Sequence, residues 1–514
     1  MNERVSNLLA DYELSPSFDQ QKAIACLRRH DWLSQITPDQ LEELLAGLAE
    51  REPPRPQSVS EAFLAAVCGH VVLRFRQPSA RDQAFMTEAA RENAALLYRR
   101  LGRSSRARQE LLTLLATARS EQDLRLLAEL AAADPPAVAQ QFLTPLFQRR
   151  DYDPAPLFPR LLDAIEHLAL AASVLDLTNY LTRIGRTPTH PAAERSGRLA
   201  ALLGEITQEL ARIEEGADSS EDVETIHNRV NEGVALVVSL CDALALIGDT
   251  SHIGKLYQAL ELSHRRVRTE AAYALAKLGE SAGADALVAL AAEPVARLRV
   301  LAYAEELDLL DKVDEKYTTP VAKAEAELVA WLSDPMQMGI PPGRCELIDS
   351  RTQYWPSYDE PVQCFLFHFA YRLGEAVYSN VGIVGPMTHA LTADLADLPP
   401  DDIYAAYAGW QAEHEEIRES QVERLSTAFQ LEAKRLERRL HDAGYQNIQS
   451  VKLASFFGDS VLVAYAERDG VPGVAVIDVQ DIDWRPTAQR PRPLGPDEVY
   501  WIYKGRRLLK AFNG

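Results

Sequence analysis

The chain of 514 residues is too long for one hydrophobic core, because single cores seldom grow beyond about 250–300 residues. Hydrophobic residues make up 47% and charged residues 25% of the chain, a globular composition that excludes a long disordered or fibrous protein. The 75 acidic residues outnumber the 54 basic ones, and the net charge of −21 repels a phosphate backbone, so we expect no nucleic-acid partner.

The sequence predicts a cytoplasmic protein without a membrane partner. The opening stretch MNERVSNLLADYELS lacks the basic start and long apolar core of an export signal. The most apolar window, 233–248, is short for a membrane span and carries Asp242, so we interpret it as a buried helix. The five cysteines are scattered and form no CxxC pair, which favours a reducing compartment over a disulfide framework or a zinc ribbon.

Helical sequence dominates the first two thirds of the chain. Alanine and leucine, which cost least in a helix, are abundant there. We predict an N-terminal helical region at 1–120 and a helical solenoid at 121–333. Stretches such as EQDLRLLAELAAADPPAVAQQFLTPLFQ keep the helical period with Pro and Asp punctuation, and they predict divergent helical hairpins before the clearest repeats.

Near the middle of the chain, a pattern recurs at an offset of about 31 residues. Gly248 aligns with Gly279, and one further shift places Arg266 on Arg297. Glycine is expected to end the second helix of each unit, because a residue without Cβ adopts the left-handed conformation at little cost. A single such helix pair cannot bury its apolar stripe alone, so neighbouring pairs must stack.

The stretches VRTEAAYALAKLGE and LVVSLCDALALIGD resemble the short bacterial HEAT repeats, a class that includes the HEAT-like units of phycobilin lyases. The resemblance covers residues 234–311 and implies an α-α superhelix. The third copy is degenerate, with Glu305 and Leu310 where an alanine and a glycine would fall. The resemblance says more about fold than about activity.

The repeats place arginines on their helix edges: Arg265, Arg266, Arg268, Arg297 and Arg299. A ridge of this kind would select an acidic protein partner. In the alternative interpretation, the same arginines pair with acids on neighbouring helices.

A composition break at 332–361 opens a third region, 334–412, which we expect to be irregular or helical with Pro- and Gly-rich loops. The stretch DSRTQYWPSYDEP gathers Arg351, Tyr354 and Trp355, either as a recognition patch or as aromatics that pin a long loop. The stretch SNVGIVGP is predicted to be a loop. A helix is expected to open at Asp401 and Asp402.

Four residues of this third region form the best metal candidate. VQCFLFHFAYRLG is either a strand or a short helix, and a helix would place Cys364 and His368 one turn apart. Cys345 or His389, the latter on a predicted following helix, would join them in a zinc site. In the alternative, Cys364 and His368 are simple core residues.

The fourth region, 413–514, is predicted to be a small α+β domain. Residues 413–443 carry one apolar stripe on a highly charged helix, which either lies across its own domain or forms a homo-oligomeric coiled coil. After Gly444 the period changes to two, and the stretch SVKLASFFGDSVLVAYAERDGVPGVAVIDV predicts three strands. EVYWIYKGRRLLKAF is expected to add a strand or a hairpin. This antiparallel sheet would close one end of the solenoid.

The sequence contains no Walker loop, nucleophile elbow, HExxH motif or kinase signature, so we expect no cofactor. We therefore predict a mostly α protein that acts as a non-enzymatic interaction scaffold through a solenoid groove. The alternative is a catalytic or ligand-binding module centred on 336–410, either lyase-like or metal-dependent.

Overall fold

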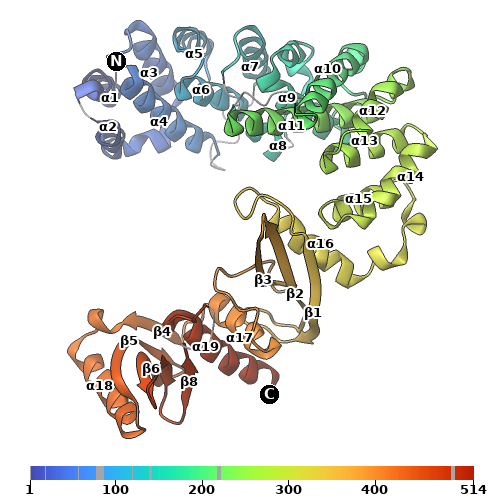
Figure 1. Ribbon diagram of the computed structural model, residues 1–514. Coiled ribbons are helices and arrows are strands. Elements are labelled where there is room, and N and C mark those ends of the chain that lie inside the picture. The colour runs from blue at the N-terminus through green and yellow to red at the C-terminus, as the bar shows by residue number, and fades with distance from the viewer. Residues whose placement is uncertain are drawn as a thin grey trace. The chain divides into compact units, whose positions relative to one another are not determined.

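The computed structural model of the chain describes residues 2–17, 19–55, 57–76, 86–118, 120–137, 142–149, 151–216, 222–487 and 492–514. The chain divides into two compact units, Met1–Leu287 and Val288–Gly514. The first unit is helical throughout its described residues. The second begins with helices and continues into two antiparallel sheets (Figure 1). The predicted fold class, a helical array followed by antiparallel sheet with helices, is confirmed.

The helices of the first unit form two rows that pack against each other (Figure 1). The first row contains α1 (Glu3–Leu14), α3 (Pro38–Glu50), α5 (Glu88–Arg100), α7 (Glu121–Ala133), the 3-10 helix Arg160–Glu166, α10 (Ser196–Glu214) and α12 (Ile253–Leu260). The second row contains α2 (Gln20–Cys26), α4 (Gln57–Arg76), α6 (Arg106–Thr117), α8 (Thr144–Gln148), α9 (Leu168–Arg183), α11 (Val223–Ile247) and α13 (Arg265–Lys277). Consecutive members of the second row pack side by side, as a solenoid requires.

The ends of these helices follow from local sequence. Thr37 and Gln40 form a reciprocal capping box at the start of α3, which satisfies two free backbone N–H groups. Gly248 follows α11 with φ of 78°, and Gly279 follows α13 with φ of 91°. The predicted glycine ends are therefore confirmed, because both residues adopt the left-handed conformation.

The repeat offset changes along the array. It is 31 residues between the glycines that end α11 and α13, but the buried faces of α13 and α15 (Pro294–Glu306) align at a smaller offset, with Val267 matching Ala296. Arg297 is therefore the counterpart of Arg268, and the predicted alignment of Arg297 with Arg266 is corrected. The degenerate third copy hid this two-residue shift, because it has no glycine in phase.

Two helices, α4 and α11, are long and apolar enough to span a membrane when length and composition alone are considered. In α4, 50% of the most apolar window is buried inside the protein, and in α11 the share is 56%. Core helices of soluble proteins pass the same test. The apolar stretch 233–248 lies in α11, where Leu240, Cys241 and Ala243 are fully buried.

In the second unit, α16 (Pro320–Leu332) joins the helical repeats to a three-stranded sheet. The sheet contains β1 (Arg344–Gln353), β2 (Val362–Leu373) and β3 (Ala376–Val384) in the order β1-β2-β3. Leu328 and Leu332 of α16 pack on Phe367 and Phe369 of β2, so a helix of the array covers one face of the sheet. The opposite face, with Leu366, packs on α17 (Pro400–Gln411).

This sheet replaces the irregular region expected at 334–412. VQCFLFHFAYRLG is a strand, and it lacks polar alternation because helices cover both faces of the sheet. The predicted loop SNVGIVGP is wrong, since most of it belongs to β3. The helix expected around His389 is also wrong: His389 forms an isolated antiparallel bridge with Ile383. The predicted helix at Asp401 is confirmed as α17.

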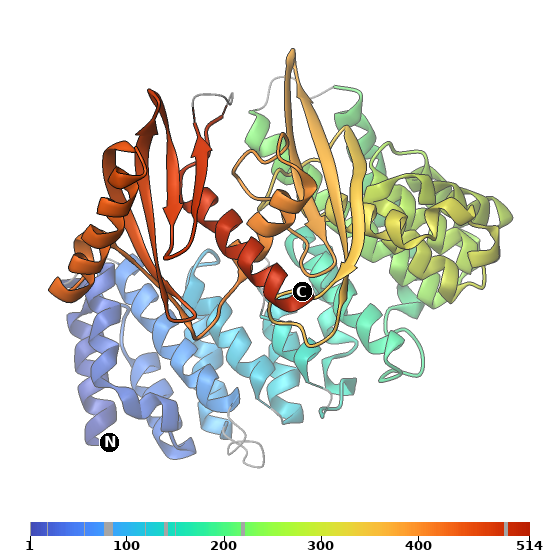
Figure 2. The ribbon, with the colours of Figure 1, turned by 90° about the horizontal axis from the view of Figure 1, so that it is seen from below.

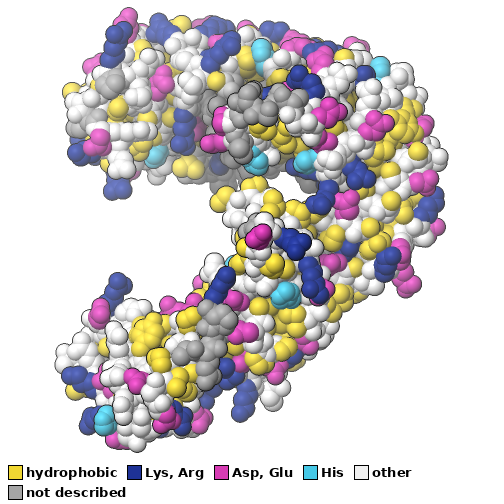
Figure 3. Space-filling model, in the orientation of Figure 1, with side chains coloured by type: hydrophobic (Ala, Val, Ile, Leu, Met, Phe, Trp, Pro, Cys, Tyr) yellow, Lys and Arg dark blue, Asp and Glu magenta, His cyan; other side chains and the backbone are white. Residues whose placement is uncertain are grey.

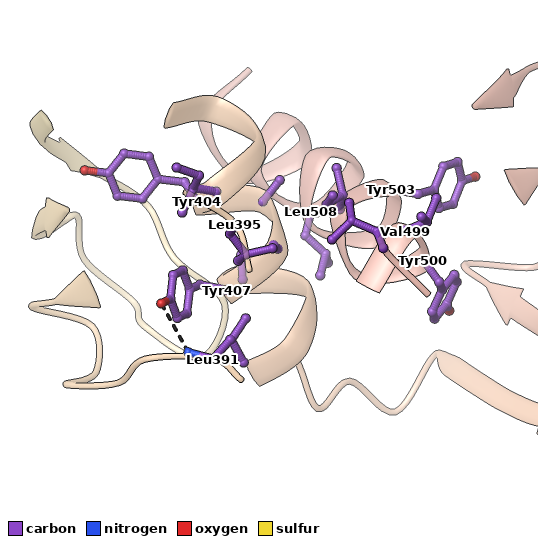
Figure 4. Packing of buried hydrophobic residues seen from close by; sticks show 14 of the residues in the cluster. Leu391, Leu395, Tyr404, Tyr407, Val499, Tyr500, Tyr503 and Leu508 are labelled. Atoms are coloured by element: carbon purple, nitrogen blue, oxygen red, sulfur yellow. Dashed lines mark hydrogen bonds between the residues drawn. The ribbon is translucent and has the colours of Figure 1, made fainter. Parts of the chain in front are cut away.

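The centre of the second unit is a crossing of α17 and α19 (Pro496–Asn513). Figure 4 shows Tyr404 and Tyr407 of α17 on one side of a buried cluster, Tyr503 of α19 on the opposite side, and Leu508 of α19 between them. The Tyr407 hydroxyl donates to the carbonyl of Val381 at 2.7 Å, which ties the crossing to the three-stranded sheet. Residues of both sheets belong to this cluster, so the crossing lies between the two sheets.

The second sheet is five-stranded and antiparallel, with β4 (Ile417–Gln421), β5 (Gln446–Phe456), β6 (Asp459–Arg468), β7 (Val471–Ile477) and β8 (Ile482–Pro486) in sequence order. The three strands predicted after Gly444 are confirmed as β5, β6 and β7. One face packs on α18 (Thr427–Asp442) and the other on α19, as Figure 2 shows.

Two predictions for this region are wrong. Residues 413–443 are not one helix, because β4 and a 3-10 turn precede α18. EVYWIYKGRRLLKAF forms α19 rather than a strand or hairpin. The stripe on α18 does lie across its own domain: Ala433, Leu436 and Leu440 are buried against the sheet, while Phe429 is 54% exposed.

Candidate partner-binding surfaces

Three of the predicted ridge arginines lie in the first turn of α13. Arg265 and Arg266 are exposed, and Arg268 is half-buried. Arg265 and Arg268 also interact within the chain. The start of a helix carries partial positive charge, so the positive charges of three arginines there are unfavourable. A nearby anion would stabilise them. The position fits an acidic partner, and it fits internal pairing as well.

Arg297 is buried rather than exposed on a ridge, with a relative exposure of 3%. Its guanidinium donates to the carbonyl of Ala291 at 2.9 Å, to the carbonyl of Ala322 at 2.8 Å, and to the carboxylate of Glu325 at 2.6 Å. Arg297 therefore ties the turn before α15 to α16, which is the internal pairing that the sequence left open. Arg299 is exposed, and its guanidinium lies 4.7 Å from the centre of the Tyr303 ring.

The aromatic loop after β1 is fixed to the second unit. Trp355 is fully buried, and its indole N–H donates to the side chain of Gln411 at 2.6 Å. Tyr354 is 41% exposed, while its backbone N–H and carbonyl both bond to the Asn513 amide. Of the two interpretations of this stretch, the geometry of Trp355 matches the pinning of a long loop.

Arg351 belongs to a small charged cluster beside the same loop. Its guanidinium pairs with Asp349 and Asp401, each at 2.7 Å, and lies 4.6 Å from the centre of the Tyr404 ring. These contacts join β1 to the start of α17. They occupy the guanidinium on two sides, while part of the side chain stays exposed.

The four predicted metal ligands do not meet around one position. Cys364 packs in the cluster on the α17 face of the sheet, and Cys345 packs against the α16 face. His368 follows Cys364 by four strand positions, which is about 13 Å along β2 and too far for a shared zinc ion. Within the described residues, no group of three or more His, Cys, Asp and Glu side chains is arranged to hold a metal.

Burial also opposes thiolate formation at both cysteines. It raises the pKa of Cys364 to about 11 and that of Cys345 to about 12. His389 stacks on Trp410 with ring centres 4.3 Å apart and contacts Trp331 edge-on at 5.3 Å. Burial lowers the pKa of His389, so its imidazole acts as a neutral packing group between α16 and α17.

A groove opens on the last repeat, between α15, the 3-10 turns that follow it and α16. We call it the repeat groove; its volume is about 620 Å³, and it is lined by Leu298, Leu301, Ala302, Glu305, Leu310, Asp311, Thr318 and Lys323. Leu298 is 39% exposed and Leu310 is 40% exposed. Half of the eight lining residues are apolar and half are polar or charged.

The charges at the repeat groove have no partners within the part of the chain that the structure describes. Glu305, Asp311 and Lys323 are exposed, and none of them forms an ion pair there. Sequence reasoning did not assign this site. Its signal was present, because Glu305 and Leu310 are the two residues at which the third copy departs from the repeat pattern.

Basic and acidic side chains are mixed on the face of the molecule that Figure 3 shows. In Figure 3, basic and acidic side chains alternate across the visible face of the helical unit instead of gathering in one strip. This distribution offers local charged contacts rather than a continuous track for a polyanion.

Comparison with known families identifies one segment of the chain. Residues 238–308 match the family described as HEAT repeats, in agreement with the resemblance drawn from the sequence. HEAT repeats generally mediate protein–protein interactions. No curated protein and no solved structure matches the chain. The matched segment ends within the groove-forming part of the last repeat.

Proposed function

We propose that this protein is a non-enzymatic interaction scaffold that captures a protein partner in the repeat groove. The observation that carries the proposal is the overlap of a HEAT-repeat match at 238–308 with the repeat groove, half of whose lining residues lie in the matched segment. Two leucines that are each about two-fifths exposed stand at this groove, where burial against a partner would be favourable.

The partner segment is an amphipathic helix of mixed charge. Leu298 and Leu310 offer apolar contacts, while Lys323 requires an acidic residue opposite it. Glu305 and Asp311 require a basic residue on the other side. A helix supplies all three features on one face at spacings of three and four residues. Charges at the rim would govern partner choice more than affinity.

The exposed arginines of α13 supply a second contact of the same scaffold. Arg265 and Arg266 stand at a helix end that favours anions, so they suit an acidic segment. Arg297 is excluded from this role by its burial.

The test is affinity capture from a lysate of the organism that encodes the protein. Leu298→Glu with Leu310→Glu places two charges on the groove floor, and both sites are exposed enough for the fold to tolerate them. Leu96→Glu is the matched control, because Leu96 is also 39% exposed but lies on α5. We expect at least one protein to be captured by the wild type and the control and lost from the double variant. The same captured set from all three would overturn the proposal.

A further inference from the structure

A second groove lies in the first unit, far along the chain from the HEAT-matched residues. We call it the N-terminal groove; it is formed by α2, α4 and the start of α6, which pack side by side in the second row (Figure 1). Its volume is about 660 Å³. It follows α4 from Ser58 to Leu73, a length of about 22 Å at 1.5 Å per residue.

The floor of the N-terminal groove is apolar and made of small residues. Ala62, Ala66 and Gly69 follow one another on α4 at spacings of four and three, which places them on one face. A Cβ added to Gly69 would meet no atom within 4 Å, so the space above this helix is open. Ile24 is 38% exposed and Leu73 is 55% exposed at its borders.

A buried hydroxyl at this groove lacks a hydrogen-bond partner. Ser105 is 3% exposed and lines the groove, and its Oγ has no hydrogen-bond partner among the residues that the structure describes. It holds the N-cap position of α6 without making the usual side-chain cap. Leaving a buried hydroxyl unpaired is costly, so a polar group from outside the chain would be stabilised there.

The rim of the groove carries uncompensated negative charge. Arg106 pairs with Glu110 at 3.6 Å. Glu61, on the α4 side, forms no ion pair within the described part of the chain. The negative charge at the rim would therefore favour a partner that places a basic side chain beside Glu61.

We propose that the N-terminal groove binds an amphipathic α-helix of a partner protein, about four turns long, with a Lys or Arg beside Glu61 and a polar group at Ser105. Length supports a helix, because 22 Å corresponds to about 15 helical residues. The floor of small residues supports it too, since they let a second helix axis approach to about 8 Å. The groove walls are helices, so an extended strand would find no open strand edge to pair with.

This inference does not rest on the proposed function, because the N-terminal groove and the repeat groove share no residue. Together the two grooves would let one chain hold two partners. The helical unit would bind one of them even if the repeat groove bound nothing.

The test uses the full chain and a phage-displayed library of 15-residue peptides. Selection on the wild type is followed by counter-selection on Gly69→Phe, which places a large side chain over α4 at a position where an added Cβ meets no atom within 4 Å. Gly69→Ala is the matched control, because a methyl group leaves most of the groove open. Glu61→Lys reverses the rim charge. Circular dichroism shows whether each variant is folded.

We expect enriched peptides with apolar residues spaced by three and four and at least one Lys or Arg. Their affinity should fall at least tenfold for Gly69→Phe and for Glu61→Lys, and should change less than twofold for Gly69→Ala. Failure to enrich such peptides, or equal binding to Gly69→Phe, would overturn the proposal. Sedimentation with phosphatidylcholine vesicles that Gly69→Phe abolishes would also overturn it, because the groove would then face lipid.

Discussion

Two helix pairs, one in each unit, pack by different means. α11 and α13 lie against each other, and Leu240, Leu244 and Leu275 on these helices are fully or almost fully buried. In the second unit, α17 and α19 cross with backbone against backbone, because Gly409 faces Trp501 and Gly505 faces Ala405. Side-chain packing can adjust when one residue changes, whereas a backbone contact has no such freedom. The α11–α13 pair should therefore accept substitutions that the α17–α19 crossing rejects.

The sharpest test of this contrast is Gly505→Val. Any Cβ at position 505 would overlap the carbonyl of Ala405, so α17 and α19 must separate and open the cluster between the two sheets. We expect a loss of about 4 kcal/mol or more in the free energy of unfolding of the second unit. Urea denaturation followed by circular dichroism measures it.

The control for this change is a glycine of the repeats. A Cβ at Gly254, near the start of α12, meets no atom within 4 Å, so Gly254→Ala should not destabilise the protein. If Gly505→Val and Gly254→Ala had the same effect on stability, the two helix pairs would not differ in the way described.

A buried ion pair in the second unit gives a second contrast with the helical unit. Asp402 of α17 is 3% exposed and pairs with Arg485 of β8 at 3.0 Å and with Arg506 of α19. Asp402→Asn removes the buried charge and leaves Asp483, at 3.5 Å from Arg485 and 3.4 Å from Arg506, as the remaining carboxylate beside both arginines. Breaking a buried pair costs about 3–5 kcal/mol, and because the Arg506 side chain is 46% exposed we expect about 3 kcal/mol.

The comparison pair for Asp402 lies on the surface of the repeats. Glu166 pairs with Arg198 at 2.8 Å, with side-chain exposures of 54% and 41%. Glu166→Gln should change stability by less than about 1 kcal/mol, because exposed pairs are weak. Chemical denaturation of both variants at the same ionic strength compares them. A larger loss for Glu166→Gln than for Asp402→Asn would contradict the contrast.

The helical unit contains a buried histidine, His190, whose protonation should change the stability of the fold. It is 3% exposed, it bonds to Asn179 at 2.9 Å, and the Ala192 backbone N–H donates to its Nδ1 at 3.2 Å. This donor requires an unprotonated Nδ1, so the folded state holds neutral histidine with Nε2 carrying the proton. Burial lowers the pKa of His190 from 6.5 to about 4.

The pH dependence follows with a definite sign. Between pH 6.5 and pH 4 the unfolded chain binds the His190 proton and the folded chain does not, so stability falls as the pH is lowered through this range. We expect a loss of about 2 kcal/mol between pH 7 and pH 5 from this residue. His190→Gln should remove that part of the dependence. Urea denaturation of the wild type and of the variant at pH 7 and at pH 5 measures this contribution. The same loss of stability in both proteins between the two pH values would exclude the role of His190.

Sequence patterns predicted the repeats because their evidence is local. Gly248 and Gly279 end helices that contain their own apolar stripes. The three-stranded sheet could not be predicted in this way, because a strand covered on both faces shows no alternation. β4 was missed for a related reason: Ile417–Gln421 is a polar edge strand whose pairing with β5 depends on residues far along the chain.

The candidate sites were predicted less well than the fold. The segment predicted as a strand or hairpin is the helix α19, whose Tyr500 and Tyr503 are buried in the cluster at the crossing with α17. Arg297 was expected on a ridge of the repeats or in an internal ion pair, and Trp355 in a recognition patch or in the pinning of a loop; both are buried by contacts with other elements. The grooves escaped detection because a concave surface is made by several helices at once.

The smallest expected effect is an increase in the free energy of unfolding, and it concerns Gly69 of α4. Gly69 lies inside α4, where glycine costs about 1 kcal/mol relative to alanine. A methyl group at this position meets no atom within 4 Å, so Gly69→Ala should raise the free energy of unfolding by about 1 kcal/mol. Urea denaturation measures the gain. A loss of stability instead would mean that the space over α4 is filled in the folded protein, and the N-terminal groove could then not receive a partner helix.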